Sequence, residues 1–419
     1  MYSKRTFSVG SITVLAITIS LFCVLWIGMA MAQEKPIKIG VVCSLTGTAA
    51  PDAQDIVNGI QMCVDDVKGR VAGRPIKLII EDDGMNPAMG LAKVRKLLME
   101  DNIDVLEGIL LGSVNGAVAP YTNEQKVIYL PMAASPTALG YKKNMPYFFR
   151  LNPSGTQLTH PFGDWVYKNL GVREVVTLAM DYTAGYDAVS SFQRTFEEAG
   201  GKVIQKMWVP MNVMDFAPYI SRINRDADGI FVSVTGTNTL RFAKLFEESG
   251  LKEKMKVLGG STVTHENLLS SMGDEVLGYY SVSWWSAALE TPEAQRFVKE
   301  YRKRFGFVPA YGSSGYAATM WLLEGIRNAK GNVEDKAKFA QVLENTRLAK
   351  SPRGPIEVDD YHSVVLNAYI RKVERVGGEL QNTIIDTIPN VTQFWKYNPD
   401  EFLKEPLYSR DYPPCRYCK

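Results

Sequence analysis

Short apolar runs rich in β-branched residues alternate with amphipathic stretches from Ile37 onward. The runs have the length and composition of strands, and the stretches between them repeat apolar residues at helical spacing. This first set has strands at 37–43, 76–80, 105–110 and 127–130 and helices at 56–67, 89–99 and 116–123. Strands that alternate with helices are typical of a parallel sheet covered by helices on both faces. We therefore expect a first α/β sandwich.

A second set of the same kind begins after Pro153. It has helices at 156–169, 188–198, 216–224 and 238–248 and strands at 175–180, 202–209, 229–234 and 255–258. Between the two sets, the segment 147–151 ends at Asn152-Pro153, which predicts an extended strand that crosses from one sandwich to the other. The sequence thus predicts an α/β protein with two αβα sandwich lobes joined by a hinge.

The later elements must pack back on these two lobes. They comprise a strand at 276–283, helices at 292–305, 313–328 and 335–344, and strands near Ile356 and at 364–373. Because such elements cannot bury their apolar faces alone, we expect each lobe to be discontinuous in sequence. Lobe 1 would comprise 33–150 with 281–358, and lobe 2 would comprise 151–280 with 359–394. Residues 395–419, rich in Tyr and Pro and without periodicity, resemble an appended tail.

Residues 1–32 have the layout of a secretory signal peptide. Lys4 and Arg5 precede an apolar stretch, and Ala30-Met31-Ala32 then forms a small-residue cleavage signal before polar residues begin. The alternative is an uncleaved membrane anchor, since the apolar stretch approaches spanning length. Lipidation is not expected, because Cys23 follows the bulky Phe22. We expect cleavage after Ala32 and an exported, periplasmic protein.

Charge and composition exclude several classes of protein. Of 419 residues, 47 are Lys or Arg and 45 are Asp or Glu, and the leader carries two of the basic residues and no acidic one. The exported chain is therefore neutral overall, which argues against a nucleic-acid partner. With three histidines and four exported cysteines, a metal site is not expected. The disulfide connectivity is open, but a small tail disulfide between Cys415 and Cys418 is favoured over a redox-active pair.

The sequence has none of the common nucleophile, zinc-protease, Walker or dinucleotide-binding motifs. His160 and His362 lie in contexts typical of surface histidines. Thr264-His265-Glu266 offers an acid–base pair, but a Thr shortly before an acid at a helix start is more typical of an N-terminal cap. Asp82-Asp83-Gly84 follows a strand and is typical of a turn. We expect no cofactor, and a secreted enzyme is a distant alternative.

Polar loops that follow the strands are more informative, because ligands of open α/β sheets bind at the carboxyl ends of the strands. The helix amino ends in such loops suit a carboxylate. These loops contain Thr46, Ser113 and Ala133-Ala134-Ser135 in the first lobe, and Tyr182, Ala184, Thr235 and Ser261 in the second. Each loop alone can simply cap a helix. Together they predict a ligand site between the lobes.

Four segments, 37–47, Asn58-Gly59, Asp181-Tyr182 with Gly185, and 314–318, resemble the branched-chain amino-acid class of periplasmic binding proteins. The likeness extends from about Ile37 to Val373 and rests on the order and spacing of the segments. It implies a type I periplasmic-binding fold with three crossover strands and a solute held between the lobes. It also implies a monomer without catalytic activity, which delivers its solute to an ABC permease in the inner membrane.

The resemblance also implies roles for individual residues. The family's carboxylate-binding serine loop falls at Ser113, and its second carboxylate loop falls at 133–135. Its aromatic wall falls at Tyr311, which is kept as tyrosine. The aromatic pairs at 279–280 and 284–285 are further candidates for flat walls, or else they pack between the lobes.

Two departures from the family pattern bear on the solute. Ser261 stands where the family has the acidic residue that holds the ammonium group, and Ala184 stands where it has a tyrosine. A buried ammonium without a carboxylate partner costs several kcal/mol. We therefore expect a small aromatic or aliphatic carboxylate without an α-amino group. The alternative is an amino acid or amide whose amine is anchored by Asp52, although this residue can also be an N-cap.

Overall fold

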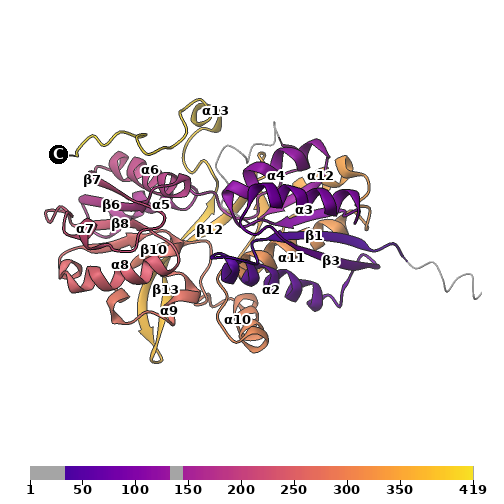
Figure 1. The fold of residues 1–419 in the computed structure, drawn as a ribbon, viewed down its shortest axis with the longest axis horizontal. Coiled ribbons are helices and arrows are strands. Elements are labelled where there is room, and N and C mark those ends of the chain that lie inside the picture. Colours follow the sequence, from indigo (N-terminus) through magenta and orange to yellow (C-terminus); the bar gives the residue numbers. More distant parts are fainter. Residues whose placement is uncertain (1–33, 133–144, 419) are drawn as a thin grey trace, which may run out of the picture.

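The computed structural model describes residues 34–132 and 145–418, arranged as two α/β lobes side by side (Figure 1). Residues 1–32, predicted to be a signal peptide, and the predicted ligand loop at 133–135 lie outside the described residues. Within these ranges, no helix combines the length and the apolar character that crossing a membrane requires.

The first lobe is built on a five-stranded sheet with the order β2-β3-β1-β4-β5. Its strands are β1 (Ile37–Cys43), β2 (Arg70–Val71), β3 (Arg74–Asp82), β4 (Val105–Gly108) and β5 (Ile128–Pro131). All pairings are parallel except that of β2 with β3. The first-lobe helices are α2 (Ala50–Asp66), α3 (Pro87–Met99), α4 (Gly112–Glu124), α11 (Gly312–Asn328) and α12 (Lys336–Glu344).

Alternating side chains of β1 bury both faces of this sheet. Ile39 and Val41 belong to the core that contains α2 and α11, whereas Val42 belongs to the core of α3 and α4. A strand directs successive side chains to opposite faces. Apart from Lys38 near its start, the strand has no charged or polar side chain, as expected for the centre of a parallel sheet.

Two glycines allow α2 and α11 to approach closely. A Cβ atom on Gly59 would lie 2.1 Å from the carbonyl oxygen of Gly312, and one on Gly315 would lie 2.4 Å from that of Ile56. Neither distance is compatible with a real side chain. The Asn58-Gly59 and Ser314-Gly315 segments that carried the resemblance thus meet in space, and they bring the late helix α11 onto the first lobe.

The second lobe has an eight-stranded sheet with the order β11-β12-β10-β9-β8-β6-β7, and β13 pairs with β12. Its strands are β6 (Glu174–Met180), β7 (Lys202–Val209), β8 (Gly229–Ser233), β9 (Lys256–Gly259), β10 (Tyr280–Ser283), β11 (Glu357–Val358), β12 (Val364–Val376) and β13 (Glu379–Val391). The five strands from β6 to β10 are parallel, and β12 and β13 add an antiparallel hairpin at one side. The remaining helices are α5 (Thr159–Asn169), α6 (Thr183–Glu198), α7 (Ala217–Ile220), α8 (Thr237–Glu248), α9 (Glu266–Leu269), α10 (Pro292–Phe305) and α13 (Pro399–Phe402).

The chain crosses between the lobes three times, after β5, after β10 and after α12. Buried polar side chains tie these crossings together. Arg150 donates hydrogen bonds to Ser363 Oγ (3.0 Å) and Gln393 Oε1 (2.6 Å), and Arg353 donates one to Asn152 Oδ1 (3.0 Å). The predicted two-lobed fold with three crossover segments is confirmed.

Some local predictions are wrong. No strand was expected after Val373, yet β13 forms there, and the helix predicted at 216–224 is reduced to the single turn α7. His160 and His362, predicted on the surface, are buried, with exposed fractions of 0% and 1%. His362 stacks on Phe149 with ring centroids 4.1 Å apart. In both cases the residues that cover the histidine come from distant parts of the sequence.

Candidate functional site

One hydrogen bond joins the lobes near the carboxyl ends of their strands. Asp52 is the third residue of α2, which follows β1, and Asn267 belongs to α9, which follows β9. Asn267 Nδ2 donates to Asp52 Oδ1 at 3.0 Å. Because the N-cap of α2 is Ala49, Asp52 is not an N-cap, although its charge still suits the positive end of the helix.

Tyr311, immediately before α11, lies next to this hydrogen bond. Its ring packs edge-on against His265, with centroids 4.8 Å apart, and is tilted against Trp284 at 5.8 Å. Burial raises the pKa of Tyr311 well above its usual range, the charge of Asp52 acts in the same direction, and the phenol of Tyr182 is also among the groups that influence it. Segments from both lobes therefore surround this tyrosine.

We call this group of side chains the interlobe site. It consists of Asp52, Tyr182, His265, Asn267, Trp284 and Tyr311.

Three buried polar atoms of the interlobe site have no hydrogen-bond partner among the described residues. They are His265 Nε2, Asn267 Oδ1 and Trp284 Nε1. Burial lowers the pKa of His265 below its usual range, so its imidazole is neutral at neutral pH. Unpaired buried polar atoms are costly, and a polar ligand or water would normally satisfy them. The site thus combines aromatic surfaces with hydrogen-bonding capacity.

Ser261 begins a 3-10 turn (Ser261–Thr264), and a buried arginine of β12 holds this turn in place. Arg371 donates hydrogen bonds to the Ser261 carbonyl (3.3 Å) and to Thr264 Oγ1 (3.3 Å). It also pairs with Glu266 at 3.3 Å. Burial raises the pKa of Glu266, and the charge of Arg371 opposes that shift.

The capping role expected for the Thr264-His265-Glu266 segment is therefore wrong. Glu266 is the partner of Arg371, and α9 has no side-chain cap. His265 and Asn267 were not predicted to belong to the ligand site. Their position in the loop after β9, the same loop as Ser261, is the signal that could have included them.

Other predicted residues are distributed over both lobes. Tyr182 immediately precedes α6 and is half-buried, and Ala184 is the second residue of that helix. The Thr235 hydroxyl lies 3.4 Å from Met180 Sδ, beside the loop of Tyr182. Ser113 is exposed in the first turn of α4.

Thr46 has a structural partner. It donates its hydroxyl to Asp82 Oδ2 at 2.7 Å, and Asp82 also accepts from the backbone N–H of Leu45 and of Gly84. Asp83 accepts from Ser44 Oγ and from the Met85 N–H. Both aspartates therefore stabilise the turn after β3, as their spacing predicted.

Only one member of the two late aromatic pairs belongs to the interlobe site. Trp285 packs on Phe297, and Tyr279 lies in the core of the second lobe. A cavity of about 290 Å³, lined by Tyr279, Tyr280 and several lysines, lies at the amino ends of β9 and β10, away from the interlobe site. Trp284 alone stands beside Tyr311.

The two-lobed α/β fold is the architecture of periplasmic binding proteins. A family model described as "Periplasmic binding protein" matches residues 36–379, so the chain belongs to that family. The family implies a periplasmic location and a role in ABC transport. Homologues and structural neighbours of the chain are solute-binding proteins, not enzymes.

Individual relatives support the same assignment. A Leu/Ile/Val-binding protein homolog 6 of Brucella melitensis is 26% identical over 380 residues, covering 88% of this chain and 96% of that protein. A solute-binding protein of Rhodopseudomonas palustris BisB5, solved with 3,4-dihydroxybenzoic acid, is 32% identical with a TM-score of 0.81; the match covers 88% of this chain and 100% of that one. An ABC transporter substrate-binding protein of Sphaerobacter thermophilus is 28% identical with a TM-score of 0.82, covering 86% and 99%.

Proposed function

We propose that this protein is the exported solute-binding component of an ABC importer and that it binds a small aromatic carboxylate. The observation that carries the proposal is the ring of Tyr311 between His265 and Trp284, with unpartnered buried polar atoms on both neighbours. Flat aromatic walls suit a flat solute, because stacked or edge-on rings are favoured over contact with water.

Polar groups at the site suit a carboxylate better than an ammonium ion. Ring N–H groups on His265 or Trp284 can donate to a carboxylate oxygen, and such charge-assisted bonds are about twice as strong as neutral ones. Ser261 brings no negative charge to the loop after β9. The Asp52 carboxylate can accept from a phenolic hydroxyl on the far side of a hydroxybenzoate ring.

The remaining predicted residues complete the proposed site. Thr46, Ser113 and Thr235 would line the space between the lobes, with Ser113 as a donor to the solute carboxylate. Ala184 would leave room for a ring where the family pattern has a tyrosine. The lobes would close on the solute by bending at the three crossings, and the closed form would engage an ABC permease in the inner membrane after the leader is cleaved.

A second candidate is an amino acid whose ammonium group is bound by Asp52. The position of this carboxylate beside Tyr311 favours it, because Asp52 is the acidic member of the interlobe site. The Brucella relatives are named as Leu/Ile/Val-binding homologues, in keeping with this candidate.

Calorimetry on the exported chain with separate solutes distinguishes the two candidates. We expect benzoate, 4-hydroxybenzoate or 3,4-dihydroxybenzoate to bind and leucine, isoleucine and valine to bind poorly. Ser261→Glu should reduce carboxylate affinity and partly restore amino-acid binding. Micromolar leucine binding without any response to the aromatic acids would overturn the aromatic-carboxylate proposal.

A further inference from the structure

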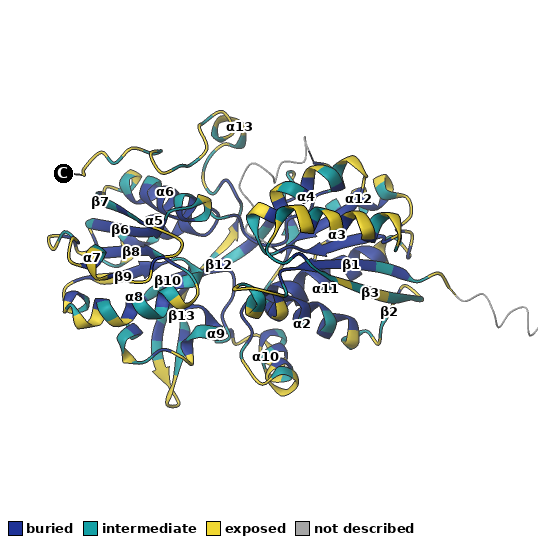
Figure 2. Ribbon diagram, in the orientation of Figure 1, coloured by how far each residue is buried: buried dark blue, intermediate teal, exposed yellow. Residues whose placement is uncertain are grey.

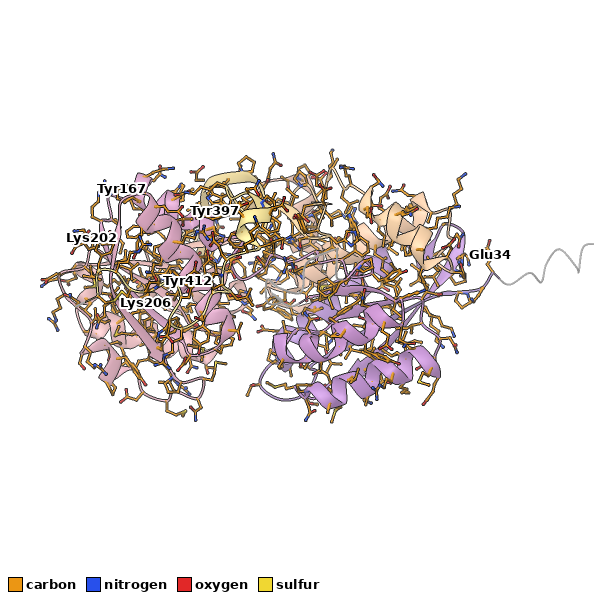
Figure 3. All side chains as sticks on the ribbon, turned by 90° about the horizontal axis from the view of Figure 1, so that it is seen from above. Glu34, Tyr167, Lys202, Lys206, Tyr397 and Tyr412 are labelled. Atoms are coloured by element: carbon orange, nitrogen blue, oxygen red, sulfur yellow. A yellow bond between two sulfur atoms is a disulfide. The ribbon has the colours of Figure 1, made fainter. Side chains whose placement is uncertain are left out.

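The C-terminal residues 395–418, which we call the strap, form a segment docked on the second lobe. They lie beyond residue 379, where the family match ends. The strap carries the short helix α13 and runs past α5 and α6 (Figure 1). Figure 3 shows its residues Tyr397 and Tyr412 over the second lobe, the latter near Lys206 of β7.

The first part of the strap is anchored by Arg194 of α6 and by α5. Arg194 Nη2 donates to Glu405 Oε1 at 3.0 Å, and its guanidinium lies 3.8 Å from the centroid of the Tyr397 ring. Asp164 of α5 accepts from Trp395 Nε1 at 3.0 Å. These contacts combine a charge pair with aromatic packing and so fix both ends of α13.

His160 of α5 is enclosed by the same segment. Its Nε2 lies 2.8 Å from the hydroxyl oxygen of Tyr408, and the rings of Tyr397, Phe402 and Tyr408 surround it at centroid distances of 5.4 to 5.9 Å. Burial lowers the pKa of His160 to about 3, so the ring stays neutral at physiological pH. His160 is therefore buried because the strap packs over it.

The last part of the strap is held through its backbone. Ser190 Oγ donates to the Tyr412 carbonyl at 3.0 Å, Gln193 Nε2 to that of Pro414 at 3.0 Å, and Lys206 Nζ to that of Pro413 at 3.1 Å. The expected disulfide between Cys415 and Cys418 closes the end of the strap.

Between these two anchored parts, the strap reaches the loop that leads to the interlobe site. Arg410 Nη1 donates to Asp181 Oδ2 at 2.6 Å, and the Tyr186 hydroxyl donates to Asp181 Oδ1 at 2.5 Å. Asp181 immediately precedes Tyr182, the second-lobe tyrosine of the interlobe site. The arginine and the tyrosine therefore hold the two carboxylate oxygens of Asp181, the first residue of the β6–α6 loop.

We propose that Arg410 is a positioning residue, through which the strap holds the β6–α6 loop in its ligand-binding conformation. The strap is anchored on both sides of Arg410. The guanidinium is therefore kept close to Asp181, which corresponds to a high effective concentration. The exposed side chains of this ion pair, 55% for Arg410 and 30% for Asp181, limit its strength. The effect of the strap on solute affinity rests on the proposed function, but its effect on the loop does not.

The test compares two single substitutions and one shortened form of the exported chain. Arg410→Ala removes the contact with Asp181. Arg416→Ala is the matched control, because Arg416 is an exposed arginine of the same strap. A chain ending at Ser409 keeps Glu405 and Tyr408 at their anchors and removes both Arg410 and the disulfide-closed end.

Amide hydrogen exchange at 181–187 without solute is the first measurement. We expect about two- to fivefold faster exchange in Arg410→Ala, consistent with the loss of an exposed ion pair, a larger increase in the chain ending at Ser409, and no change in Arg416→Ala. Unchanged exchange in the first two variants would overturn the proposal.

Affinity for 3,4-dihydroxybenzoate is the second measurement, and we expect it to fall by about the same factors. Faster exchange with wild-type affinity would overturn the claim that the strap sets the ligand-binding conformation. Another outcome is that neither the wild type nor any variant binds an aromatic acid while hydrogen exchange changes as expected. That result would contradict the proposed solute class but would still support the proposal that the strap holds the β6–α6 loop.

Discussion

Asn267 and Asp52, 215 residues apart in sequence, meet across the two lobes with a hydrogen bond of 3.0 Å. The same carboxylate acts electrostatically on His265 and Tyr311. Asp52 is therefore both a contact between the lobes and the acidic member of the interlobe site, and its substitution should affect the two candidate solutes differently.

Asp52→Asn should leave benzoate affinity within about threefold of wild type or strengthen it, because a negative charge near a carboxylate is removed. For a solute whose ammonium group pairs with Asp52, the same change should cost about 10- to 100-fold or more. Calorimetry measures both. Asp65→Asn, at the other end of the same helix, is the control and should change neither. A large loss of benzoate binding in Asp52→Asn would contradict the first expectation.

Glu107 of β4 should make the stability of the first lobe depend on pH. Its side chain is fully buried and accepts from Thr319 Oγ1 at 3.0 Å, and burial raises its pKa to about 8. The nearby thiols of Cys43 and Cys63 also have raised pKa values and stay neutral. The folded state therefore keeps a proton on Glu107 that the unfolded state releases above its usual pKa near 4.5.

The sign follows from this difference in bound protons. The free energy of unfolding falls as pH rises from about 4.5 to about 8, and the accumulated loss reaches a few kcal/mol. Glu107→Gln mimics the protonated form, so its melting temperature should fall less than that of wild type between pH 6 and pH 9. Glu124→Gln, on the surface of α4, should behave as wild type. The prediction would be contradicted if the melting temperatures of Glu107→Gln and wild type changed with pH by the same amount.

Gly59→Ala should destabilise the contact between α2 and α11. The added Cβ would lie 2.1 Å from the Gly312 carbonyl oxygen, so the helices must separate, at a cost of about 1–3 kcal/mol. Gly116→Ala is a matched control, because this helical glycine of α4 has no atom within 4 Å of the added Cβ. Gly116→Ala should be neutral or slightly stabilising. Thermal denaturation measures both; equal melting temperatures would show that the helices tolerate a wider spacing.

The burial pattern of Figure 2 shows why much of the fold was predictable from sequence. The central strands are buried along most of their length, and most of the helices that cover the sheets bury one side, so local hydrophobic periodicity marks both. The late helix α10 has the bounds expected for it. The hairpin strand β13 was missed because its residues are mostly exposed or half-buried, which leaves no periodic signal.

The site was predictable only in part, for a different physical reason. Sequence indicates which loops follow strands, and this was enough to select Tyr182 and Ser261, whereas Tyr311 was selected through the resemblance to the family. It does not indicate that Asn267 contacts Asp52, that Arg371 pairs with Glu266, or that the strap covers His160.

The sequence by itself determined the alternation of strands and helices, the two-lobed class and the loops that can bind a solute, because each follows from hydrophobic burial within a short window or from the order of segments. Only the tertiary structure decided which polar groups are buried together. Contacts between residues more than 100 positions apart depend on how the three crossings place the lobes and the strap, and no local pattern records that placement.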